Sequence, residues 1–276
     1  MHKLGDFNEL EVVKEVDFGV YLKFNEEEIL MPKKYVKEGT KAGDVVRVFV
    51  YRDSEDRLIA TTLSPKAKVG EFAYLTVKDV NKVGAFLDWG LDKDLLVPHN
   101  RQKVKMEKGK SYVVRVLIDE ATDRIIATSK INNYLETQAD DEIKEGDEVD
   151  LLVYKVVELG AGVIINNKYA GIIYNSDIYK PIKTGDKLKG YISKIREDKK
   201  IDVTIRSFGF KKVLDSKDII LNKLIENHGF LALTDKSSPE IIESELQMSK
   251  KSFKKAIGML YKEKKIEILD NGIRLT

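Results

Sequence analysis

Three aromatic residues stand at repeated positions of the sequence where they could stack on unpaired nucleic-acid bases. Phe18 and Tyr21 flank Gly19, and Phe86 follows Gly84 by two residues. Alternating apolar and polar residues predict a half-buried strand at both places, with these rings on the polar face. Exposed rings of this kind stabilise bound bases by roughly 1–3 kcal/mol each. A ring that only covers its neighbours explains a single such aromatic equally well, and it is the repetition that favours stacking.

Cationic side chains near these rings are candidates for contacts with phosphate groups. They are Lys23, Arg57, His99, Arg101 and Arg124. A lone surface arginine or histidine is most simply solvated. A set of them beside aromatic residues on matched strands favours binding of a polyanion.

A second group of cations lies near the C-terminus, on a segment with helical spacing of its apolar residues. The group consists of Lys250, Lys251, Lys254 and Lys255. A helix that enters a nucleic-acid groove has this pattern, and so does an ordinary solvated helix face. The helix does not begin with the Arg, Asn or Gln residues that read base edges, so contact with RNA or with a phosphate backbone is favoured over sequence-specific reading of DNA.

Catalytic and metal-binding patterns are weak. The three histidines, His2, His99 and His228, are scattered without metal-ligand spacing, and the chain has no cysteine. Gly109-Lys110-Ser111 is similar to the end of a phosphate loop, but Val104 stands where that loop requires its first glycine. We therefore expect a protein that is not an enzyme and that needs no cofactor or metal.

Composition limits the remaining possibilities. The 276 residues, 42% of them hydrophobic, are enough for two to four domains with packed cores. The formal charge is only +2, so a polyanion must be held by local patches or by stacking. The N-terminus has no signal-peptide core and no apolar run approaches the length of a membrane span, so we expect a cytoplasmic protein without a membrane partner.

The elements that position these residues are predicted from an internal repeat. A glycine is followed 14 residues later by a second one in three places: Gly5 and Gly19, Gly70 and Gly84, Gly146 and Gly160. Each unit has about five short strands with Gly-rich turns, which is typical of a small closed barrel of the OB type. We predict barrels over residues 1–63, 69–130 and 146–206. In each, the second glycine is expected where the strand bulges or bends.

The third unit differs at the ring position, where Gly162 stands. Tyr169, Tyr174 and Tyr179 are candidates to replace the ring, although core or rim positions are favoured for each. Between the first two units, residues 64–68 predict a short polar linker. Between the second and third, the spacing of Ile131, Leu135 and Ala139 predicts a helix or an ordered spacer over residues 131–145.

The last segment, residues 212–276, changes to helical periodicity and then to a hairpin. Ser238 and Pro239 form a helix start, and Asn271-Gly272 is a hairpin turn. The expected apolar positions of the first two helices are Ile219, Ile220, Leu224, Ile225, Ile241, Ile242 and Leu246. Three helices followed by a hairpin predict a winged helix. The fold class is therefore mostly β, with three tandem five-stranded barrels and an α-helical C-terminal domain.

These motifs resemble a known family. Phe18-Gly19-Val20-Tyr21, and the stretch from Gly84-Ala85-Phe86 to Pro98-His99, are similar to the ribosomal-protein-S1-type RNA-binding domain. Three such units followed by a winged helix, with GAFLDWGLDKDLLVP in the second, resemble the conserved virulence factor B and YitL-like family over the whole chain. The resemblance implies an RNA-binding regulatory protein that affects expression of virulence and other genes. The second unit departs from the S1 pattern at Val83, and the third has neither aromatic.

The favoured hypothesis is a protein that binds single-stranded RNA through barrels in series and affects gene expression after transcription. Linked modules gain affinity through effective concentration, which suits units that are each weak. One alternative is a transcriptional regulator that binds DNA through its winged helix. The other is a ribosome-associated adaptor whose barrels hold protein. The ribosome and mRNA-associated proteins are candidate further partners.

Overall fold

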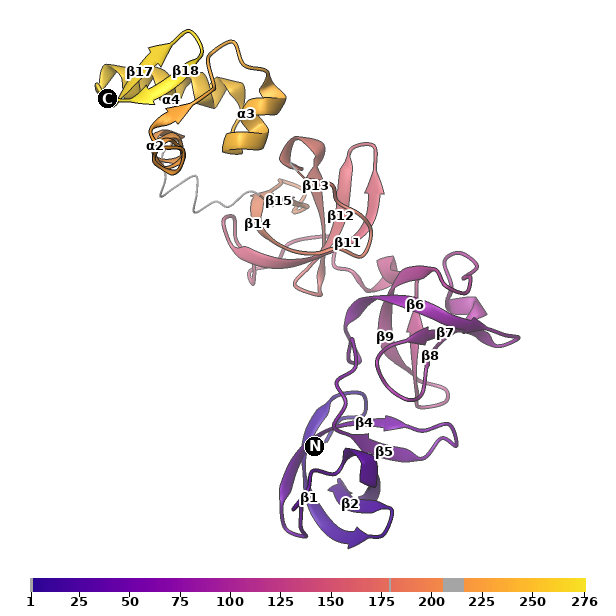
Figure 1. The fold of residues 1–276 in the computed structure, drawn as a ribbon. Helices are drawn as coiled ribbons and strands as arrows, with labels where there is room; N and C mark the ends of the chain where they lie inside the picture. Colours follow the sequence, from indigo (N-terminus) through magenta and orange to yellow (C-terminus); the bar gives the residue numbers. More distant parts are fainter. Residues whose placement is uncertain (1, 179, 206–215) are drawn as a thin grey trace. The chain divides into compact units, whose positions relative to one another are not determined.

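The computed structural model describes residues 2–178, 180–205 and 216–276, which form three closed barrels and then a small domain of helices and a sheet (Figure 1). The predicted fold class is confirmed: mostly β, with tandem OB-like barrels and a C-terminal winged helix. The chain divides into two compact units, Met1–Leu135 and Glu136–Thr276. Residues 206 and 212–215, at the edges of two predicted domains, lie outside the described residues.

The first barrel is closed by five strands in the spatial order β1-β2-β3-β5-β4. These strands are β1 (Phe7–Val16), β2 (Gly19–Phe24), β3 (Glu27–Pro32), β4 (Val45–Arg52) and β5 (Leu58–Thr61), with a 3-10 helix, η1 (Lys33–Tyr35), after β3. β3 and β5 pair in parallel and the other neighbours are antiparallel. Along β1, buried Leu10 and Val12 flank exposed Glu11, so one face of the sheet encloses the core.

The second and third barrels repeat this topology. The second contains β6 (Phe72–Val80), β7 (Gly84–Asp88), β8 (Leu95–Pro98), η2 (His99–Arg101), β9 (Ser111–Asp119) and β10 (Arg124–Thr128). The third contains β11 (Glu148–Val157), β12 (Gly160–Ile165), β13 (Tyr169–Tyr174), η4 (Asn175–Asp177), β14 (Lys187–Ile195) and β15 (Ile201–Thr204). In each barrel the fifth strand pairs in parallel with the third, as in the first.

The repeated glycines occupy equivalent positions, as predicted. Gly19, Gly84 and Gly160 each open the second strand of a barrel and pair with the last residue of the third strand. A bulge at the glycine, one of the two expected reasons, is wrong, because the bulge interrupts the preceding strand in all three barrels. The glycine is required by close approach: an added Cβ would lie 2.2, 2.3 and 2.0 Å from a backbone carbonyl oxygen of the third strand.

The junction between the first two barrels contains an apolar centre. The Phe49 ring of β4 meets the Trp89 ring after β7 edge-to-face, with 5.9 Å between centroids. Phe49 and Tyr51 belong to the same buried cluster as the core of the second barrel. The linker at residues 64–68, expected to be polar, buries Ala67, and the Lys66 amide donates to the Trp89 carbonyl oxygen at 2.7 Å. The first two barrels therefore share a core.

Of the two alternatives predicted for the segment 131–145, the structure shows the ordered spacer and not the helix. Only Ile131–Tyr134 is helical, as the 3-10 helix η3. The Glu136 and Ala139 amides donate to carbonyl oxygens of Lys168 and Lys199, at 3.0 and 2.8 Å. At these two residues the backbone is bonded to the third barrel, so the four-residue spacing of buried side chains does not come from an α-helix.

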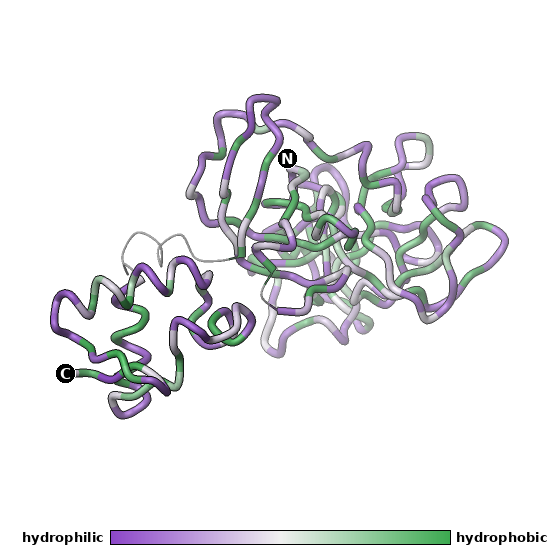
Figure 2. Tube along the Cα trace, turned by 90° about the horizontal axis from the view of Figure 1, so that it is seen from above, coloured by the Kyte–Doolittle hydropathy of each residue, from purple (hydrophilic) through white to green (hydrophobic). Residues whose placement is uncertain are grey.

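The C-terminal domain has the predicted winged-helix order. Its elements are α2 (Ser216–Glu226), β16 (Phe230–Leu231), α3 (Pro239–Leu246), α4 (Lys250–Lys262), β17 (Ile266–Leu269) and β18 (Gly272–Leu275). The Ser238 hydroxyl accepts from the Ile241 amide at 3.3 Å and caps α3. Two expected core positions are wrong, because Ile225 and Ile241 are exposed on the outer sides of their helices. Figure 2 shows apolar and polar residues alternating along the chain.

No helix in the described ranges is both long and apolar enough to cross a membrane.

A pH-dependent contribution to stability is expected in the third barrel. The Asp140 carboxylate accepts hydrogen bonds from the Tyr169 hydroxyl at 2.5 Å and the Lys168 ammonium at 2.9 Å, which lower the pKa of Asp140 to about 2. The contribution is complete above the ordinary pKa of 3.8 and is lost as the pH falls toward 2. Asp140→Asn should therefore lower the Tm above pH 5 and make little difference near pH 2, measured by calorimetry. A deficit that is constant with pH would contradict this.

Candidate nucleic-acid interface

The first barrel presents two aromatic rings together. Phe18, in the turn before β2, is 58% exposed, and Tyr21 on β2 is half-buried. Their ring centroids lie 6.5 Å apart with the planes at 80°, an edge-to-face pair. The next residue along β2, Leu22, is fully buried, as predicted, and anchors the strand. The pair thus stands on a fixed strand with open ring surface.

Lys14 lies beside this ring pair and is not among the predicted site residues. It lies across from Tyr21 in the β1–β2 register, with its Nζ 4.7 Å from the ring centroid. An ion pair with Glu28 at 2.5 Å raises the pKa of Lys14. The sequence could have indicated Lys14, because pairing the residues on either side of the Asp17-Phe18 turn places Lys14 across from Tyr21. The predicted Lys23 is exposed on the same strand, with Glu28 as its cross-strand partner.

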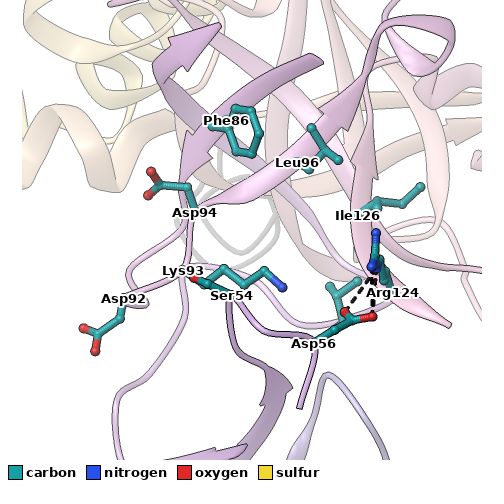
Figure 3. A pocket seen from close by; sticks show the side chains of 10 residues that line it. Ser54, Asp56, Phe86, Asp92, Lys93, Asp94, Leu96, Arg124 and Ile126 are labelled. Carbon is teal, nitrogen blue, oxygen red and sulfur yellow. Dashed lines mark hydrogen bonds and ion pairs between the residues drawn. The ribbon is translucent and has the colours of Figure 1, made fainter. Parts of the chain in front are cut away.

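The second barrel presents Phe86 in a pocket of about 460 Å³ (Figure 3). Phe86 on β7, Leu96 on β8 and Ile126 on β10 come from three adjacent strands, and the register pairs Leu96 with both of the others. Phe86 is half-buried while the following Leu87 is fully buried, as the alternation predicts. These three side chains give the pocket an apolar floor.

The rim of this pocket is charged, and part of it comes from the first barrel. The Arg124 guanidinium donates from Nε and Nη2 to Asp56, which lies between β4 and β5. The Lys93 Nζ donates to the Asp53 carbonyl oxygen at 2.6 Å, and burial lowers the pKa of Lys93. Asp94 pairs with Lys78 at 2.7 Å. Figure 3 shows Arg124 and Asp56 facing each other beside the apolar floor.

The other predicted cations of the first two barrels do not line this pocket. Arg57 is bound by its neighbours Asp53 and Glu55, at 2.7 and 2.8 Å. The His99 Nε2 lies 3.0 Å from the Asn81 carbonyl oxygen. The structure thus brings Phe86 together with Arg124, and Phe18 with Tyr21, and leaves Arg57, His99 and Arg101 elsewhere.

Arg101 lies in a different pocket of the second barrel, of about 590 Å³, beside Arg115. Its Nη2 is 3.7 Å from an Asp119 oxygen. The Arg115 guanidinium lies over the Phe72 and Tyr134 rings, 4.8 and 5.4 Å from their centroids, and burial lowers its pKa. The sequence prediction missed Arg115, because its stacking partners come from distant segments.

Among its described residues, the third barrel has no aromatic ring at the position of Tyr21 and Phe86, where Gly162 stands. An added Cβ at Gly162 would lie 2.8 Å from the Lys155 Cε, so the lysine chain covers the place where a ring stands in the other barrels. Tyr169 is fully buried, and the Tyr174 hydroxyl accepts from Arg196. Tyr179 lies outside the described residues.

Comparison with known proteins covers both ends of the chain. Residues 218–275 match the CvfB-like winged helix domain, and residues 4–63 match the S1 domain. The C-terminal domain is thus similar to the CvfB-like winged helix. The uncharacterized protein YitL of Bacillus subtilis is 27% identical over 93% of this chain and 88% of its own length. Conserved virulence factor B of Staphylococcus epidermidis is 26% identical over 94% of this chain and 87% of its own. The predicted family resemblance is confirmed.

A solved structure from Streptococcus pneumoniae, described as a multidomain protein with nucleic acid binding domains, is 27% identical. It covers 99% of this chain and 98% of its own, with a TM-score of 0.44.

The C-terminal winged helix places the predicted lysines on the outer side of α4. Lys251, Lys254 and Lys255 are exposed, whereas Phe253 and Ile257 are buried in the domain core. Lys250 is partly exposed, and the Nζ of Lys254 lies 3.7 Å from Asp235. The hydroxyl of Ser249 accepts from the Ser252 amide at 3.2 Å and fixes the start of the helix. The amphipathic helix thus presents a cationic face to solvent.

Within the described ranges, no three His, Asp or Glu side chains are grouped so as to hold a metal ion.

Proposed function

We propose that this protein binds single-stranded RNA through the ring surfaces of its first two barrels and the lysine face of α4. One observation carries the proposal: Tyr21 and Phe86 hold the same strand position, paired with Leu30 and Leu96, and both rings remain partly open to solvent. OB-type barrels use this part of the sheet to bind oligonucleotides.

Flat rings select for unpaired bases, because bases inside a duplex have no free face. The overall charge of +2 means that stacking and local patches must supply the affinity. Each of the first two barrels offers one ring or one ring pair, so each is expected to bind weakly. Barrels in series gain strength because the second contact is intramolecular.

The biological role that we propose is regulation of gene expression after transcription, by binding and without catalysis. The match of the N-terminal barrel to the S1 domain supports nucleic-acid binding. We propose single-stranded RNA as the ligand because the rings are exposed and because α4 does not begin with base-reading residues.

The test compares a labelled unstructured RNA with a duplex DNA of equal length, at one salt concentration, by fluorescence anisotropy on the full chain. Tighter binding of RNA is expected. Preference for the duplex would overturn the proposal and favour a DNA-binding regulator. Failure to bind either would favour an adaptor that holds protein.

The lysines of α4 are expected to contribute through charge. Replacing Lys251 and Lys255 by Gln should reduce the salt slope of RNA binding by about 0.7–1 for each phosphate group that the helix no longer binds. If both lysines bind phosphate, affinity at 0.15 M salt should fall about tenfold. Discrimination among RNA sequences should change little, because phosphate contacts carry no base information.

The matched control is Lys223→Gln with Lys236→Gln, which makes the same charge change elsewhere in the domain. This variant should keep the wild-type slope. An equal decrease in both double variants would mean that only net charge matters, and no decrease in either would make α4 an ordinary solvated helix.

A further inference from the structure

The hairpin between β4 and β5 of the first barrel forms one wall of the second barrel's pocket. Asp56, at a left-handed turn position with φ of 68°, points at Arg124. Two further contacts hold the hairpin there: Arg52 to Asp123 at 2.8 Å, and Lys93 to the Asp53 carbonyl oxygen at 2.6 Å. The position of Asp56 is therefore defined by several contacts across the junction.

The contact between Arg124 and Asp56 has the geometry of phosphate recognition. Nε of Arg124 lies 3.1 and 3.0 Å from the two carboxylate oxygens, and Nη2 lies 3.0 Å from Oδ2. Arginine uses this same pair of donors for two oxygens of a phosphate. The carboxylate thus fills the edge of Arg124 that a phosphodiester would take.

The contact is also exchangeable. The side chains of Arg124 and Asp56 are 55% and 38% exposed, so solvent and ligand reach both. Exposed ion pairs of this kind contribute little to stability. A phosphate arriving at Arg124 can therefore replace the carboxylate without disturbing the barrel.

The pairing of the charges around the pocket also indicates that Asp56 competes for Arg124. Three carboxylates and two cations line it. Asp92 and Asp94 are paired with Lys34 and Lys78, which lie outside the lining. Asp56 instead pairs with Arg124, which is itself a lining residue. An incoming strand must therefore compete with Asp56 for the Arg124 guanidinium.

We propose that Asp56 is a built-in competitor for phosphate at Arg124, displaced when a strand whose base stacks on Phe86 brings its phosphodiester to the guanidinium. The inference rests on the proposed function and adds a means of selection. A phosphate that binds without a stacked base only exchanges one anion for another at Arg124, so its net binding free energy is small. A strand that also stacks on the apolar floor gains enough to open the contact.

The test uses Asp56→Asn in the full chain. Asparagine has the same size and tolerates the left-handed turn, so the hairpin should keep its form. With Arg124 released from a charged partner, the strand no longer has to displace a carboxylate. Affinity for single-stranded RNA at 0.15 M salt should therefore rise by up to about fivefold, while the salt slope should stay near the wild-type value because the same number of phosphates is bound. The increase should vanish in Asp56→Asn combined with Arg124→Gln.

Asp123→Asn is the matched control. Asp123 also has a left-handed backbone, with φ of 53°, and also forms an ion pair across the same junction, but with Arg52. The Asp123→Asn variant should have the wild-type salt slope and the wild-type affinity for single-stranded RNA. An equal increase in this variant would overturn the inference in favour of a general charge effect or a loosened junction. Weaker binding by Asp56→Asn would overturn it by making Asp56 a positioning residue.

Failure of the inference can be told from failure of the proposed function. If the inference alone is wrong, the wild type binds RNA and Asp56→Asn binds it no more tightly. If the proposed function is wrong, the folded wild type itself does not bind RNA, and the inference falls with it.

Discussion

Replacing Phe86 by Ala should weaken binding of single-stranded RNA by about 1–3 kcal/mol, or about 5–150-fold. The ring lies in the floor of an open pocket, while the adjacent Leu87 is fully buried in the core. The substitution therefore removes a stacking surface and leaves the core intact, so the fold should hardly change. Anisotropy titration of the full chain measures the weakening, and circular dichroism checks the fold.

Tyr74→Ala is the control, because Tyr74 is a partly exposed aromatic on β6 of the same barrel and does not line the pocket. It should bind RNA like the wild type. Tyr21→Ala should weaken binding by a similar amount at the first barrel. Unchanged affinity in Tyr21→Ala combined with Phe86→Ala would retire the stacking hypothesis and direct attention to the third barrel and the winged helix.

Gly84→Ala should destabilise the second barrel by about 3 kcal/mol. The added Cβ would lie 2.3 Å from the Val97 carbonyl oxygen and 2.9 Å from its carbon. Both are backbone atoms of a paired strand, so neither can move away as a side chain would. Trp89 is the single tryptophan and is buried beside this strand, so its fluorescence during urea unfolding reports on this barrel.

Gly109→Ala separates this clash from backbone strain. Gly109 has a φ of 80°, and an added Cβ would meet nothing within 4 Å. Alanine there should cost only the left-handed backbone, about 1–2 kcal/mol. Gly84 does not have a positive φ. If Gly84→Ala proves no worse than Gly109→Ala, the close approach of the strands is not what requires the glycine.

The sequence predicted the barrels well because their signals are local. The paired glycines, the alternation around Leu22 and Leu87, and the repeat itself all lie within one unit. The helical alternative for residues 131–145 failed because the spacing of its buried side chains comes from contacts with a distant part of the chain. Ala139 has helical spacing with Leu135, but the chain there is bonded to the third barrel.

The site was predicted in part for the same reason. Tyr21 and Phe86 follow from strand alternation, whereas the partner of Arg124 lies 68 residues away in another barrel. No local pattern reveals that contact, since it depends on how two folded barrels dock. The pairing of Arg57 with Asp53 is different, because those residues are four apart and their attraction could have been inferred.

The shared core of the first two barrels has a consequence for synthesis on the ribosome. When Thr61 at the end of β5 has been made, the first barrel has all its strands, yet Phe49 still lacks Trp89. The second barrel cannot close until Thr128 has emerged, about 3–13 s later at ~5–20 residues per second. During that interval an aromatic surface of the nascent chain stays open, and slow codons within this stretch would lengthen its exposure to chaperones and to aggregation.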